Sequence, residues 1–145
     1  MNALIQLYER DLAKLHTEIS LFDTEDKLWQ TKEGIINCAG NLALHLVGNL
    51  NHFIGSVIGK TGYVRHREAE FNDKNVAKEK LLSMIEETSN VVATSLSQMP
   101  EDLLKQKYPI VVFEDEMTYE FFLLHLLGHL NYHLGQINYL RRILN

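Results

Sequence analysis

The sequence predicts an all-α protein: an up-down four-helix bundle with a short irregular or extended segment before the last helix. Apolar residues recur at spacings of three and four over four long stretches, which is typical of amphipathic helices. Glycine, proline or charged segments separate these stretches. The 145 residues contain no repeat or flexible linker, so they predict one domain, residues 1–145, with a buried core.

The first helix is expected over roughly residues 2 to 21. Charged side chains alternate there with an apolar face made of Leu4, Leu7, Tyr8, Leu12, Leu15 and Ile19. A polar connection from Asp23 to Gly40 follows, with Trp29 as its one large anchor.

The second helix is predicted from about Cys38 to Ile58, with Asn37 as its N-cap. It ends at residues 59–62, Gly-Lys-Thr-Gly, whose composition is typical of a helix C-cap and turn. The charged stretch from Tyr63 to Asn72 is predicted to be irregular.

Asp73 is the predicted cap of a third helix over about residues 74 to 98. Residues 107–113 contain a β-branched run that favours an extended segment, although its proline argues against a central strand. Thr118 is the predicted cap of a fourth helix that reaches the C-terminus.

Two of these helices share an unusual composition. Residues 34–59 and 121–140 contain no Asp, Glu, Lys or Arg. Each stretch is long enough to cross a bilayer, but many polar side chains in lipid would be costly, so we expect helices buried in protein. They hold five of the seven histidines: His45, His52, His125, His129 and His133.

The histidines of the last helix are spaced for chelation. His125, His129 and His133 follow one another at intervals of four, so each adjacent pair lies on one helical face, about 6 Å apart along the axis. His45 and His52 lie two turns apart, about 10 Å, so one of them is the expected third ligand. Three neutral imidazoles leave a divalent ion with open positions, a pattern typical of catalytic sites. The spacing leaves open which pair of the last helix binds the ion.

Three motifs carry a resemblance to a known family. Residues 129–137, His-Leu-Asn-Tyr-His-Leu-Gly-Gln-Ile, with Leu140 and Arg141, resemble the closing helix of the DinB superfamily. Residues 44–50 resemble its second helix. Residues 65–71, Arg-His-Arg-Glu-Ala-Glu-Phe, are similar to a loop of its DUF1572-like branch.

This resemblance implies a bundle of the DinB type, frequently a homodimer, that binds zinc, nickel or a similar divalent metal ion. Carried over to this chain, the ligands are His45, His129 and His133, while His125 and His52 have no assigned role. The family includes thiol-dependent transferases and isomerases that use a low-molecular-weight thiol, and metal-dependent hydrolases. The resemblance therefore predicts S-transferase or hydrolase chemistry on a small molecule.

Other polar residues are candidates for orienting the ligands or binding a substrate, each with a plain structural alternative. They are Asn49, His125, Gln136, and Arg67 or Arg65. The alternative for Asn49 and Gln136 is a hydrogen-bonded amide in the core, and the alternative for His125 is a packed imidazole. For the two arginines it is a run of solvated charges. Candidates for a general base are Glu68, Glu70 and Glu116. The glycines of the two charge-free helices allow either close approach around a metal or tight packing alone: Gly48, Gly55, Gly59, Gly128 and Gly135.

Composition narrows the class of protein further. The net charge of −5 gives no electrostatic basis for binding nucleic acid or an anionic membrane. A single cysteine, Cys38, and an N-terminus without signal-peptide features predict a cytoplasmic protein. The last helix is apolar around most of its circumference, which predicts a homodimer. Two functions remain: a metal-dependent enzyme, or a metal-binding, stress-associated dimer without catalysis.

Overall fold

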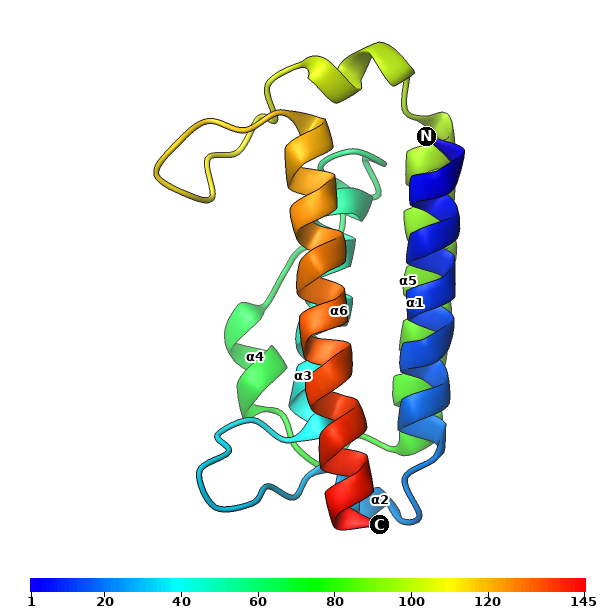
Figure 1. Cartoon of the computed structure of the whole chain (residues 1–145), viewed down its shortest axis with the longest axis vertical. Helices are drawn as coiled ribbons and strands as arrows, with labels where there is room; N and C mark the ends of the chain where they lie inside the picture. Colours follow the sequence, from blue (N-terminus) through cyan, green and yellow to red (C-terminus); the bar gives the residue numbers. More distant parts are fainter.

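The structure, a computed structural model, describes all 145 residues and is all-helical, as predicted (Figure 1). Residues 107 and 118 form one isolated β-bridge in the segment before the last helix, which is otherwise irregular, as predicted. The elements are α1 (Asn2–Ser20), α2 (Glu25–Leu28), α3 (Ala39–Leu50), the π-helical η1 (Asn51–Ser56), α4 (Arg67–Asn72), α5 (Lys78–Gln98), the 3-10 helix η2 (Glu101–Lys105) and α6 (Tyr119–Leu144).

The directions of the long helices differ from the predicted up-down order. Asn51 donates a hydrogen bond to Thr88 at 2.8 Å, and further along both helices Gly55 approaches Val91. The α3–η1 segment and α5 are therefore parallel. The reason is the connection over residues 57–77, which contains α4 and returns the chain to the end at which α3 begins (Figure 1). The up-down order is wrong, while the prediction of four long helical segments is confirmed.

The segment predicted to be irregular between the second and third helices contains α4. The Asn41 side chain, in the first turn of α3, donates hydrogen bonds to the backbone carbonyls of Glu70 at 2.9 Å and Asp73 at 2.8 Å. These bonds attach the end of α4 to α3. Asp73 is consequently extended and ends α4, so it does not cap α5, which begins later than predicted, at Lys78.

The core lies between α1, α3, α5 and α6. It contains 29 buried apolar residues in one cluster. All of α3 is buried, whereas α6 buries one face and exposes another. Polar contacts fix α6 beside α1: Tyr8 donates to the Leu123 carbonyl at 2.6 Å, and Arg141 pairs with Glu18 at 2.6 Å.

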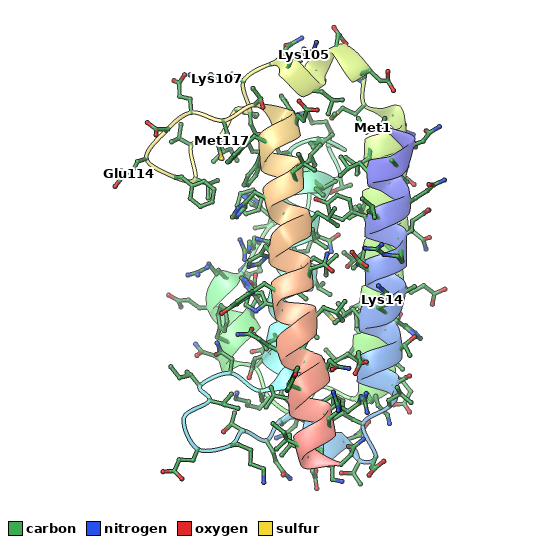
Figure 2. The ribbon with its side chains drawn as sticks, viewed as in Figure 1. Met1, Lys14, Lys105, Lys107, Glu114 and Met117 are labelled. Atoms are coloured by element: carbon green, nitrogen blue, oxygen red, sulfur yellow. The ribbon has the colours of Figure 1, made fainter.

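None of the helices combines the length and the apolar character that crossing a membrane requires. The Thr118 cap is confirmed, because its hydroxyl accepts a hydrogen bond from the Phe121 backbone N–H at 3.1 Å. The loop before it projects from the rest of the molecule with Glu114 at its tip (Figure 2), while the ring of Phe113 packs against that of His125 on α6, with centroids 4.7 Å apart.

Candidate metal centre

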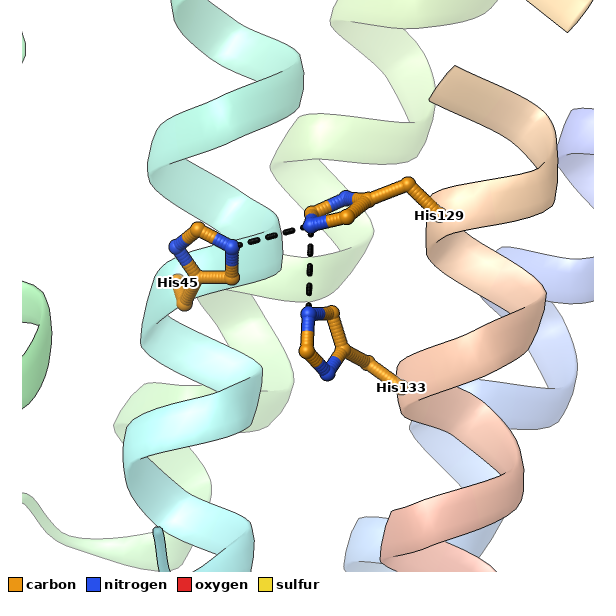
Figure 3. A group of neighbouring side chains, drawn as sticks. All are labelled: His45, His129 and His133. Atoms are coloured by element: carbon orange, nitrogen blue, oxygen red, sulfur yellow. Dashed lines mark hydrogen bonds between the residues drawn. The ribbon is translucent and has the colours of Figure 1, made fainter. Parts of the chain in front are cut away.

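Three histidines from two helices meet at one point. The Nε2 atom of His129 lies 3.1 Å from that of His45 and 3.1 Å from that of His133 (Figure 3). Each residue offers a ligand atom within 4.8 Å of the others. Tetrahedral coordination at metal–nitrogen bonds near 2.05 Å places two ligand nitrogens about 3.3 Å apart. The three nitrogens are therefore spaced to bind one ion.

The helices that carry these histidines explain the arrangement. His129 and His133 lie one turn apart on α6, so their side chains project from the same face. His45 faces them from α3, where the residue is 7% exposed and its ring packs 5.0 Å from the ring of Phe71. Of the chelating pairs that the spacing left open, the structure brings together the pair His129 and His133 with His45.

Neighbouring oxygen atoms determine where two of the imidazoles carry their protons. Nδ1 of His45 lies 3.0 Å from a carboxylate oxygen of Glu70, and Nδ1 of His133 lies 2.6 Å from the amide oxygen of Gln136. An N–H at Nδ1 donates to each oxygen, so each Nε2 presents a lone pair. His129 can donate one Nε2 proton to only one of them. A cation at the meeting point would satisfy all three nitrogens, so the donor set fits a divalent metal.

Glu70 is itself held by a largely buried cation, Arg65. Arg65 Nε donates to one carboxylate oxygen and an Arg65 terminal nitrogen donates to the other, both at 2.8 Å. Burial acts to raise the pKa of Glu70, but the hydrogen bonds and positive charge of Arg65 and the contact with His45 outweigh it and lower that pKa. Glu70 is therefore an anion that orients His45, as carboxylates commonly do behind metal-bound histidines.

Gly48 makes room for this carboxylate. A Cβ atom at that position would lie 2.1 Å from a carboxylate oxygen of Glu70. Of the two alternatives left open for the glycines, close approach next to the site is thus found at Gly48. Gly55 and Gly59 instead give tight packing against α5, while Gly128 and Gly135 face open space.

The electrostatics of the site favour neutral imidazoles. Burial, followed by the neighbouring histidines, lowers the pKa of His129 to about 3. Burial also lowers the pKa of His133, against the opposing hydrogen bond with Gln136. Both rings are neutral at pH 7, which is the form that binds a cation.

The remaining predicted residues surround the centre without joining it. His125 is exposed and its ring centroid lies 6.5 Å from that of His129. Arg67 is exposed and stacks over the ring of Phe71 at 5.7 Å. Asn49 is buried one turn from His45, and its amide oxygen has no hydrogen-bond partner.

The candidates for a general base lie in different surroundings. Glu68 is exposed, and Glu116 pairs with Lys107 in the loop before α6. Glu70 is occupied by Arg65 and His45. Sequence reasoning named Glu70 only as a candidate base; the motif at residues 65–71 was the one signal of its ligand-orienting role, because it contains both Arg65 and Glu70.

Comparison with known proteins identifies one family. A family profile described as "Protein of unknown function (DUF1572)" matches residues 3–145, which is nearly the whole chain. No curated protein matches the sequence of this chain.

Proposed function

This chain belongs to the DUF1572 family, and we propose that it is a metal-dependent enzyme with one divalent ion at His45, His129 and His133. The observation that carries the proposal is the convergence of three Nε2 atoms, two of which lie 3.1 Å from the third. Zinc or nickel suits this all-imidazole donor set. A divalent ion bound there would supply Lewis acidity at an open coordination position.

The chain's own residues then have distinct tasks. Glu70 holds the ring of His45, and Gln136 holds the ring of His133, each in the tautomer whose Nε2 lone pair can bind a cation. The unpaired, buried amide oxygen of Asn49 is a candidate acceptor for a polar group of a small-molecule substrate. Arg67, which is free of ion pairs, is better placed than Arg65 to attract an anionic substrate.

The resemblance of residues 44–50, 65–71 and 129–141 to the DinB superfamily supports a more specific reaction. We infer a bundle of the DinB type that uses a low-molecular-weight thiol in S-transferase chemistry, or water in hydrolysis. A small thiol would bind as an anion, and the positive charge of Arg67, which stacks on Phe71 beside His45, favours that form.

A second candidate is a metal-binding, stress-associated protein without catalysis. The observation that favours it is the engagement of the carboxylates: Glu70 is bound by Arg65, and Glu116 is bound by Lys107. Neither is free to accept a proton from a substrate.

Metal analysis of protein purified without a histidine tag tests the site. We expect about one metal ion per chain in the wild type and loss of that metal in the His129→Ala, His133→Ala double variant. The matched control is His52→Ala with His125→Ala, which removes two histidines outside the trio. Equal metal content in all three proteins would overturn the assignment.

Turnover then separates the two candidates. Metal-loaded protein is mixed with small thiols and an electrophilic dye, and separately with a panel of activated esters. Metal-dependent turnover that disappears in the His129→Ala, His133→Ala variant supports the enzyme. Stoichiometric metal without turnover of any thiol or ester favours the metal-binding protein.

A further inference from the structure

A groove lies between the projecting loop and the first turns of α6. Its volume of about 560 Å³ is within the range of small-molecule sites, about 300–1,000 Å³. The apolar part of its lining is made of Phe113, Met117 and Phe121. The two phenylalanines are 44% and 59% exposed, so much of their aromatic surface is left uncovered by the rest of the chain.

His125 connects this groove to the candidate metal centre. Its ring lines the groove, and its centroid lies 4.7 Å from that of Phe113 and 6.5 Å from that of His129. The two imidazoles are stacked at 22° and lie about one helical turn apart on α6, about 6 Å along the axis. A molecule that contacts His125 in the groove is therefore about one turn from the metal ligands.

The rim of the groove is acidic. Glu114, Asp115 and Glu116 line it, and no lysine or arginine does. Of these carboxylates, only that of Glu116 is paired within the chain, with Lys107. Figure 2 shows Glu114 at the tip of the loop and Met117 nearer to α6. Unpaired negative charge beside an apolar groove attracts a cation and repels an anion.

Aromatic rings and carboxylates together select one class of ligand. The face of a phenylalanine ring attracts an organic cation, and aromatic surfaces are a recurrent means of binding quaternary ammonium groups. A hydrated inorganic ion gains little from Phe113 and Phe121, and a neutral apolar molecule gains little from Glu114 and Asp115. The lining therefore fits an amine or a quaternary ammonium compound that carries an apolar body.

We propose that this groove binds the cationic, apolar part of the electrophilic substrate, and that the rest of this substrate extends past His125 to the metal centre. The extension to the metal rests on the proposed function, whereas binding in the groove does not. The groove thereby names a class of substrate, small organic cations, and gives His125 a positioning role between the groove and the ligand His129.

The charges around the site agree with transfer between two different substrates. Arg67 stacks on Phe71, which packs beside His45, and its charge favours an anionic thiol. The acidic groove favours a cation on the side of His129. In the transfer, the thiol loses its proton to water and its sulfur forms a bond to a carbon of the cation. The leaving group departs from that carbon with the bonding electron pair.

Three probes that share a benzyl group and differ in charge test the groove: benzyltrimethylammonium, benzyl alcohol and phenylmethanesulfonate. Each is titrated into ¹⁵N-labelled protein and followed by two-dimensional NMR. We expect the cation to shift the resonances of residues 113–125 and to bind at least about tenfold more tightly than the sulfonate, with the alcohol between them. Added salt should weaken binding of the cation and leave binding of the alcohol unchanged. Equal affinities for the three probes would overturn the proposal.

Variants of the loop separate the two parts of the recognition. Replacing both Glu114→Gln and Asp115→Asn should lower the affinity for the cation at least about threefold and leave that for the alcohol unchanged. Phe113→Ala should weaken both probes. The matched control is Asp26→Asn with Glu33→Gln, which removes the same charge from exposed positions at the other end of the molecule (Figure 1). A cation affinity that is equal in all these proteins contradicts the inference.

Two measurements keep this inference distinct from the proposed function. The His129→Ala, His133→Ala variant should still bind the cation, and the loop variants should keep the metal content of the wild type. Cation binding by a wild type that holds no metal would contradict the proposed function alone. Metal without cation binding would overturn the groove. If no probe shifts the groove and Phe113→Ala sediments more slowly than the wild type, a second copy of the chain covers the groove, which also overturns the proposal.

Discussion

The carboxylate of Glu70 lies 3.0 Å from Nδ1 of His45 and accepts two hydrogen bonds from Arg65, each of 2.8 Å. The carboxylate and the guanidinium are both largely buried, with side-chain exposures of 6% and 12%. A buried ion pair contributes little net stability, because desolvation offsets the attraction. The ion pair of Arg65 and Glu70 lies behind His45, which indicates that the pair fixes the orientation of the His45 ring and the position of its proton.

Replacing Glu70 with glutamine should weaken metal binding. The substitution removes the negative charge behind His45 and leaves Arg65 without a charged partner. Loss of such an orienting carboxylate typically lowers metal affinity about 10–100-fold. Competition with a chelator of known affinity measures the change. Glu68→Gln, an exposed neighbour on α4, is the control; an unchanged affinity in Glu70→Gln would show that Glu70 does not support the site.

Gly48→Ala tests the same relationship from the opposite helix. The added methyl group would lie 2.1 Å from a Glu70 oxygen and 2.6 Å from its carboxyl carbon, so the carboxylate must move away from His45. Metal affinity is expected to fall about as much as in Glu70→Gln. A combination of both substitutions should cost little more than either alone, because they act on one contact.

The control for this change is Gly135→Ala, another glycine in the interior of a helix. Its Cβ atom would lie in open space, so metal affinity should equal that of the wild type. Chelator competition on the wild type, the two single variants at residues 48 and 70, their combination and Gly135→Ala gives the comparison. A Gly48→Ala variant that binds metal as the wild type does would mean that Glu70 can move without consequence for His45.

The sequence predicted those parts of the site that depend on local spacing. The helical repeat predicts that adjacent histidines of the last helix can bind one ion, and the family resemblance names His129 and His133 as that pair. The cap at Thr118 follows from the side chain that its position requires. The choice of His45 over His52 came from a family resemblance, because spacing alone does not tell which turn of α3 faces α6. The structure places His45 against His129 of α6, and it leaves His52 with a buried Nδ1 atom that has no hydrogen-bond partner.

The parts that sequence reasoning missed depend on contacts between distant residues. The direction of α5 follows from the connection that contains α4. The side chain of Asn41 attaches α4 to α3 by donating a hydrogen bond to the carbonyl of Glu70, 29 residues away. The periodicity of each helix contains no information about such a hydrogen bond. The orienting role of Glu70 depends on the same attachment, so an irregular loop was predicted where the structure has the helix that supports His45.

Acid should destabilise the packing of α6 against α1 through Glu18. Burial acts to raise the pKa of Glu18, but hydrogen bonds from Arg141 and Asn138 outweigh it, so the folded pKa lies below the ordinary value of 4.5. A carboxyl group with a lower pKa in the folded state contributes stability above its unfolded pKa and loses that contribution as the pH falls through the folded pKa. Urea unfolding of metal-free protein at pH 7 and at a series of pH values below 4.5 should therefore show a decreasing free energy of unfolding. Glu18→Gln should cost about 1.5–3 kcal/mol at pH 7, as for hydrogen bonds to charged groups, and should flatten this decrease. Glu9→Gln, at an exposed position of α1, should leave the decrease unchanged. An equal acid dependence in wild type and Glu18→Gln would assign the effect to other carboxylates, such as that of Asp11.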